Sequence, residues 1–102
     1  MVKRIIWTVQ ADQIFTKILE FYIQRNGSKA YSRELNRKIQ SLVTILAKQP
    51  FIGSKTNYLN IRVFVSSNYK IFYQIFKDQL IIHLVWDCRQ DPESLHLDLK
   101  IR

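Results

Sequence analysis

Three short runs of β-branched and aromatic residues in the C-terminal half constrain the fold of this chain most. They cover residues 59–65, 69–76 and 80–86. In the first two runs the side chains alternate with a period of two, which is typical of β-strands. The polar residues between the runs, 66–68 and 77–79, are short enough for hairpin turns. The third run is apolar on both faces except at His83. The pattern predicts an antiparallel meander whose last strand lies inside the sheet.

The N-terminal residues predict one strand followed by a helix. Residues 2–7 are rich in apolar and β-branched side chains, and so short a strand is stable only when it joins the meander. Thr8 is the expected N-cap of the helix, and Gly27 is expected to end it in the left-handed conformation. The apolar positions between them have helical spacing: Ala11, Ile14, Phe15, Ile18, Leu19, Tyr22 and Ile23.

A second helix is expected directly after the first. Ser28 can cap it, and Pro50 ends it. Its predicted buried stripe is Tyr31, Leu35, Ile39, Leu42, Val43 and Leu46. Phe51 and Ile52, in the loop that follows, are expected to pack against the core.

The predicted fold class is α+β, with a helical hairpin packed on one face of a mostly antiparallel sheet. The element order is β-α-α-β-β-β(-β), and residues 93–102 are a possible extra strand or tail. With 102 residues, of which 47% are hydrophobic, we expect a single domain over residues 1–102.

The chain carries a formal net charge of +8. The excess is concentrated in residues 1–57, which hold ten Lys or Arg against three Asp or Glu, whereas residues 58–102 hold six against five. Simple solubility is one explanation of such a charge. An acidic partner, either nucleic acid or an acidic protein, is the more specific one.

The cysteine count and the lack of long apolar runs bear on the compartment. Cys88 is the only cysteine, so an internal disulfide is excluded and a reducing cytoplasm is expected. No stretch approaches the ~20 apolar residues that span a bilayer, so we expect no membrane partner. Cys88, His83 and His96 lack the spacing of metal ligands, and we expect neither a metal nor a cofactor.

The whole pattern resembles the RelE/ParE superfamily of type II toxin–antitoxin toxins. The resemblance covers nearly the whole chain. In the first half it consists of a strand followed by Ala11, a helix ending in Asn-Gly-Ser at 26–28, and a second helix running into Pro50 and then Ile-Gly at 52–53. In the second half it consists of Arg62, the strand YKIFY at 69–73, and the strand IIHLVW at 81–86 followed by Asp87, Cys88 and Arg89.

This resemblance implies a small, basic bacterial toxin that forms a hetero-oligomer with a cognate acidic antitoxin. RelE-like members of the superfamily cleave mRNA in the ribosomal A site, whereas ParE-like members inhibit DNA gyrase without known hydrolytic chemistry. Ribosome-dependent mRNA cleavage is our first hypothesis, with the ribosome and mRNA as partners. The alternatives are gyrase inhibition and an inactive or non-toxic nucleic-acid-binding module.

A metal-free ribonuclease needs cations that stabilise the charge developing on the phosphate. Arg62, Lys70, Arg89 and Lys55 are the candidates for a cationic cluster. By resemblance, Arg62 and Arg89 match the arginines that hold the scissile phosphate, and Lys70 matches a basic position between them. Arginine suits this role because its planar guanidinium forms two parallel hydrogen bonds. A surface ion pair of Arg62 with Asp87 or Asp91 is the alternative.

The same reaction needs a general base and a general acid. RelE-like enzymes often place a tyrosine just after the last strand, but this chain has none from Lys77 onward. Asp87 is a candidate base, although a salt bridge is its ordinary role. His83 is a candidate for substrate binding, with packing inside its strand as the alternative. Tyr69 and Tyr73 are candidates for stacking on a nucleotide base, with core packing as the alternative.

Overall fold

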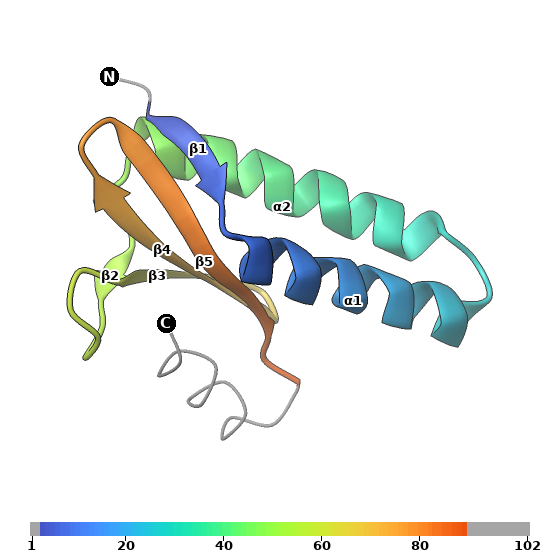
Figure 1. The fold of residues 1–102 in the computed structure, drawn as a ribbon. Coiled ribbons are helices and arrows are strands. Elements are labelled where there is room, and N and C mark those ends of the chain that lie inside the picture. Colours follow the sequence, from blue (N-terminus) through green and yellow to red (C-terminus); the bar gives the residue numbers. More distant parts are fainter. Residues whose placement is uncertain (1–2, 90–102) are drawn as a thin grey trace.

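A computed structural model describes residues 3–89 of the chain and shows the predicted α+β fold. Its seven elements are β1 (Arg4–Trp7), α1 (Val9–Asn26), α2 (Ala30–Lys48), β2 (Ser54–Lys55), β3 (Arg62–Ser66), β4 (Tyr69–Phe76) and β5 (Gln79–Asp87). The five strands form one sheet in the order β1-β5-β4-β3-β2 (Figure 1). The predicted extra strand or tail, and with it His96, lies outside the described residues.

The first strand joins the meander, as predicted. β1 pairs with β5 in parallel, with Ile5 opposite Leu80 and Trp7 opposite Ile82, whereas β3, β4 and β5 pair antiparallel. The first half of β5 is therefore paired with β1 on one side and with β4 on the other. This confirms the inference from its apolar composition that it lies inside the sheet.

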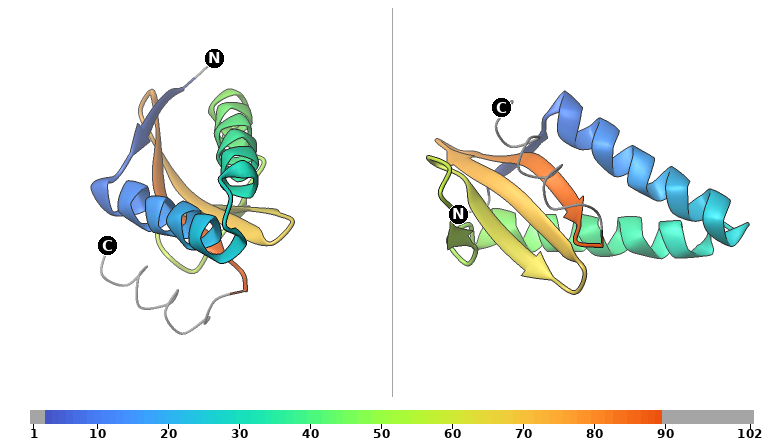
Figure 2. Two further views of the ribbon diagram at one scale, coloured as in Figure 1. Left: turned by 90° about the vertical axis from the view of Figure 1, so that its right-hand side faces the viewer. Right: turned by 90° about the horizontal axis from the view of Figure 1, so that it is seen from below.

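The two helices lie side by side on one face of the sheet (Figure 2). Thr8 caps α1 by accepting a hydrogen bond from the Ala11 amide at 3.0 Å, and Gly27 ends α1 with a positive φ of 65°. Both predictions are confirmed. At α2 the expectation was one residue off, because the N-cap position is Lys29. Ser28 still contributes by accepting a hydrogen bond from the Ala30 amide at 3.1 Å.

The main core lies between the helices and the sheet. Ala11, Phe15, Ile18 and Tyr22 of α1 and Leu35, Ile39, Val43 and Leu46 of α2 pack against Tyr69, Ile71, Tyr73, Leu80, Ile82 and Val85. A smaller cluster forms around Phe72, Leu84 and Trp86 and includes Val63 and Tyr58. Both faces of the middle of the sheet are therefore buried.

A β-bulge at His83 explains which side chains of β5 point into the main core and which point into the smaller cluster. Phe72 pairs with Leu84 but the next residue, Tyr73, pairs with Ile82, which leaves His83 as an extra residue. A bulge shifts the alternation of side chains by one residue. Ile82 and Val85 therefore both face the helices, although they are three positions apart.

The segment between α2 and β3 differs from the expectation. Phe51 and Ile52 are exposed rather than packed against the core, and Ser54–Lys55 form a short strand, β2, that the sequence did not predict. β3 begins at Arg62 rather than at Leu59, because Asn60 has a positive φ of 65°. Residues 56–61 therefore form a loop that projects from the sheet edge.

Candidate functional site

The carboxylate of Asp87 organises one end of the sheet. Asp87 is the last residue of β5, and its side chain is only 3% exposed. It accepts a hydrogen bond of 2.6 Å from the hydroxyl of Tyr22 on α1. It also accepts hydrogen bonds from the backbone N, Nε and Nη2 of Arg89 at 2.9–3.0 Å. A buried carboxylate is tolerated because these donors replace water.

Arg89 extends this network toward the solvent. Its Nη2 donates to the hydroxyl of Tyr69 at 2.8 Å, and the Tyr69 and Tyr31 hydroxyls lie 3.1 Å apart. The guanidinium carbon lies 4.9 Å from the centre of the Tyr22 ring and 5.7 Å from that of Tyr69. We call Tyr22, Tyr31, Tyr69, Asp87 and Arg89 the Arg89 network. The Arg89 side chain remains 44% exposed, so an edge of the guanidinium faces solvent.

The network separates the pKa values of its members. Burial raises the pKa of Asp87, but hydrogen bonds from Arg89 and Tyr22 outweigh burial and hold the pKa below its ordinary value. Burial, together with the hydrogen bond to Asp87, raises the pKa of Tyr22 to about 12. Burial and the contact with Tyr31 raise the pKa of Tyr69. The hydrogen bond with Tyr69 lowers the pKa of Tyr31, and Arg89 adds to that effect.

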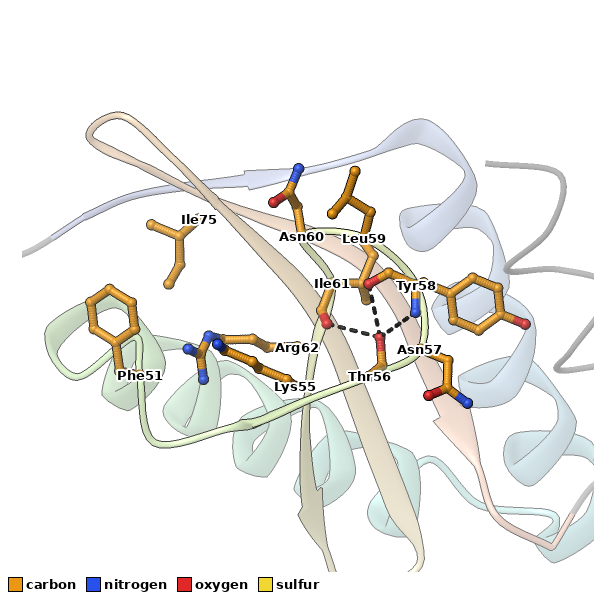
Figure 3. Close-up of a pocket in the computed structure, with 10 residues that line it drawn as sticks. All are labelled: Phe51, Lys55, Thr56, Asn57, Tyr58, Leu59, Asn60, Ile61, Arg62 and Ile75. Atoms are coloured by element: carbon orange, nitrogen blue, oxygen red, sulfur yellow. Dashed lines mark hydrogen bonds between the residues drawn. The ribbon is translucent and has the colours of Figure 1, made fainter.

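Arg62 lies in a different place, at the start of β3. Its Nη1 donates to the carbonyl of Gly53 at 2.7 Å, and its guanidinium carbon lies 5.0 Å from the centre of the Phe51 ring. Lys55 is its register partner on β2. In Figure 3 the two cationic side chains extend alongside each other toward Phe51.

Phe51, Lys55 and Arg62 line a groove of about 490 Å³. Its wall is formed by residues 55–62, and Phe51 and Ile75 complete it (Figure 3). We call it the loop groove. Its lining holds Lys55 and Arg62 but no acidic residue.

Tyr73 fixes the segment that carries the groove. Its hydroxyl donates to the carbonyl of Pro50 at 2.7 Å and accepts from the amide of Gly53 at 3.0 Å. A Cβ at Gly53 would collide with the Tyr73 hydroxyl, so only glycine allows this close approach. Tyr73 is fully buried, so its ring offers no face on which a nucleotide base could stack.

Comparison with known families identifies the chain. A sequence model of the ParE toxin of type II toxin–antitoxin systems, parDE, matches residues 5–92. The chain belongs to this family. It is therefore a type II toxin, for which the family implies an antitoxin partner, and the resemblance to the RelE/ParE superfamily is confirmed. No curated protein matches it closely enough to be counted as a relative.

In this ParE-family toxin the four predicted cations do not form one cluster. Arg62 and Lys55 share the loop groove, but Arg62 is opposite Tyr73, whereas Asp87, two residues before Arg89, is opposite Tyr69. Tyr69 and Tyr73 are four residues apart on β4, a separation on the order of 13 Å. Lys70 follows Tyr69, so its side chain lies on the opposite face of the sheet from Tyr69. The alternative that Arg62 pairs with Asp87 is wrong, since Asp87 binds Arg89. Asp91, the other alternative partner of Arg62, lies outside the described residues.

The remaining predicted residues take other places in the toxin. Tyr69 is buried but reaches Arg89 through its hydroxyl, rather than offering a ring for stacking. His83, the bulge residue, contacts the side-chain oxygen of Gln74 at 2.8 Å. Sequence reasoning placed Tyr22 and Tyr31 only in the core stripes of the helices. Nothing in their spacing indicates that their hydroxyls meet Asp87 and Tyr69.

The described part of the chain contains neither a membrane-spanning helix nor a cluster of metal ligands. No helix within residues 3–89 is long and apolar enough to cross a membrane. The same part of the chain has no group of three or more His, Cys, Asp or Glu side chains placed to hold a metal ion.

Proposed function

We propose that this ParE-family toxin arrests growth by binding and inhibiting DNA gyrase, without cleaving RNA. The separation of its cations is the observation that carries the proposal. A ribonuclease needs its cations at one phosphate, together with a base and an acid. Arg62 and Arg89 lie at different places along the sheet, and Lys70 lies on the other face.

The ion pair between Arg89 and Asp87 supports the same proposal. Asp87 engages Arg89 through Nε and Nη2 and neutralises much of its charge. An arginine held in this way is better suited to fix the end of the sheet than to compensate a phosphate that gains charge in a transition state. Inhibition by binding requires only a stable surface that fits the target.

A supercoiling assay tests the proposal. Purified toxin is expected to inhibit DNA supercoiling by gyrase, and mRNA from growing bacteria is expected to stay intact after brief induction of the toxin. Reversing the charges of exposed Lys29 and Arg33 on the helical hairpin should weaken inhibition more than Arg62→Ala does. The proposal would be refuted if gyrase supercoiled DNA normally in the presence of the toxin and if mRNA were cut only within translated codons.

Ribosome-dependent mRNA cleavage is the second candidate, and one observation favours it. The chain has no tyrosine after the last strand, but the fold brings Tyr31 and Tyr69 next to Arg89. Tyr31 is 40% exposed, and its contacts with Tyr69 and Arg89 lower its pKa, which favours the phenolate that a general base needs. Loss of mRNA cleavage in Tyr31→Phe, with retained folding, is the result expected under this candidate.

A further inference from the structure

We propose that the exposed face of α2 binds the phosphate backbone of duplex DNA. Three cations carry the proposal: Lys29 at the N-cap position of α2, and Arg33 and Arg37 on the turns that follow. We call these three residues the α2 stripe. The proposal goes beyond inhibition of gyrase, because binding to DNA is measured without the enzyme. It adds a direct contact with the DNA on which gyrase acts.

The α2 stripe is a row of positive charge along one side of a helix. Its members are four residues apart, so each lies above the one before it at a rise of about 6 Å. All three residues are exposed. A DNA strand carries a phosphate about every 3.4 Å along the axis of the duplex. A row of this length therefore faces several phosphates of one strand at once.

The charge of the α2 stripe is largely uncompensated. Residues 25–48 hold six Lys or Arg against one acid, Glu34. Within residues 3–89 the ion pairs are Arg37 with Glu34 and Arg89 with Asp87, so Lys29 and Arg33 are not neutralised there. The side chains of Arg37 and Glu34 are 66% and 69% exposed, and so exposed a pair is weak enough for a phosphate to compete with it.

The side chains around the α2 stripe favour a DNA backbone over other anionic partners. Asn36 and Gln40 are exposed beside the stripe, and their amide groups can donate to phosphate oxygens. Protein partners need apolar or aromatic anchors, and single-stranded nucleic acids need aromatic rings for stacking. The exposed large apolar residues of α2 are Tyr31 and Ile45. Tyr31 belongs to the Arg89 network, and Ile45 lies two turns beyond Arg37.

The position of α2 leaves the stripe open to a large partner. The hairpin formed by α1 and α2 extends well beyond the end of the sheet (Figure 1), so the strands do not obstruct an approach to the first turns of α2. A helix is about 10–12 Å wide, and the major groove of B-DNA admits it, whereas the major groove of duplex RNA is too narrow. Duplex DNA is therefore the expected partner rather than duplex RNA.

Fluorescence anisotropy of a labelled DNA duplex with the full-length toxin tests the proposal. The logarithm of the affinity should fall linearly with the logarithm of the salt concentration. Lys29→Gln and Arg33→Gln should each make this slope shallower by about 1 and weaken binding at 0.1 M salt by about fivefold or more. Lys17→Gln and Lys55→Gln remove the same charge at exposed positions on α1 and β2. These two controls should stay within about twofold of the wild type.

A variant that gains affinity makes the test independent of misfolding. Glu34→Gln removes the acid beside the stripe and releases Arg37, so it should strengthen DNA binding by about twofold or more. Glu20→Gln, at an exposed position on α1, should not change the affinity. Circular dichroism in the far and near ultraviolet shows that each variant is folded.

Four results would each overturn the proposal. They are no binding of the duplex at low salt, equal losses in Lys17→Gln or Lys55→Gln and in Lys29→Gln, no gain in Glu34→Gln, and tighter binding of a single strand or of duplex RNA. Gyrase inhibition by a toxin that does not bind the duplex would leave the proposed function intact. Duplex binding through the stripe without gyrase inhibition would support this inference and refute the proposed function.

Discussion

Tyr22 and Asp87, 65 positions apart in the chain, meet in the interior through a hydrogen bond of 2.6 Å between the phenol and the carboxylate. The contact ties α1 to the end of β5. It also places the one fully buried carboxylate of the described residues beneath Arg89. The end of the sheet is therefore stabilised by charge-assisted hydrogen bonds in addition to apolar packing.

Replacing this carboxylate should destabilise the toxin. In Asp87→Asn the side chain keeps its shape but loses its charge, so the hydrogen bonds from Tyr22 and Arg89 weaken. We expect the free energy of unfolding to fall by about 1–3 kcal/mol, measured by urea denaturation followed through tryptophan fluorescence. Asp78→Asn, an exposed position in the β4–β5 turn, should change it by less than about 0.5 kcal/mol. Equal effects of the two substitutions would contradict the prediction.

The lowered pKa of Asp87 predicts a loss of stability in acid. The folded state binds a proton at Asp87 less readily than the unfolded state, whose pKa is near the ordinary value of 3.8. The contribution of the charged carboxylate is therefore complete above that value and is lost as the pH falls below it. Urea denaturation across this pH range should show the difference between wild type and Asp87→Asn shrinking toward low pH. A difference that stays constant with pH would show that the charge of Asp87 is not its cause.

The tyrosines of the Arg89 network should ionise in a defined order. Tyr31 should lose its proton first, because Tyr69 and Arg89 stabilise its phenolate, and Tyr22 should ionise only near its raised pKa of about 12. Ultraviolet titration of the phenolate absorbance measures this order. Tyr31→Phe should remove the earliest step, whereas Tyr22→Phe should leave that step in place. An unchanged early step in Tyr31→Phe would assign it to another tyrosine.

Gly53 should be intolerant of a side chain. Gly53→Ala places a methyl group against the Tyr73 hydroxyl, and we expect it to cost about 1–3 kcal/mol of stability through overpacking. Tyr73→Phe removes the hydroxyl and its two hydrogen bonds, so the double variant should be less destabilised than the sum of the single changes. Thermal unfolding of the four proteins measures this coupling. Additive effects would show that the collision is relieved by a shift of the loop instead.

Most of the fold could be predicted from the sequence because local rules decide it. The period-two runs predicted β3, β4 and β5, and Thr8 and Gly27 marked the ends of α1. Local rules failed where a few residues depend on distant partners. Ser54–Lys55 is a strand only because β3 lies beside it, and Phe51 stays outside the core because Tyr73 holds the backbone on either side of it.

The candidate site depended far more on the tertiary structure. The sequence offered Arg62, Lys55 and Arg89 as members of one cationic cluster, but strand register decided that they do not converge on one phosphate. Phe72 is buried in the smaller cluster because the bulge at His83 turns Leu84 and Trp86 toward it.

The sequence by itself determined the fold class, the ends of α1, the meander and the superfamily, since each depends on side-chain period and on residues close together in the chain. Only the tertiary structure decided that Tyr22, Tyr31 and Tyr69 would surround Arg89 and that Lys55 and Arg62 would share a groove. Hydrogen bonds between side chains from different elements require the register and packing of those elements, which no local pattern specifies.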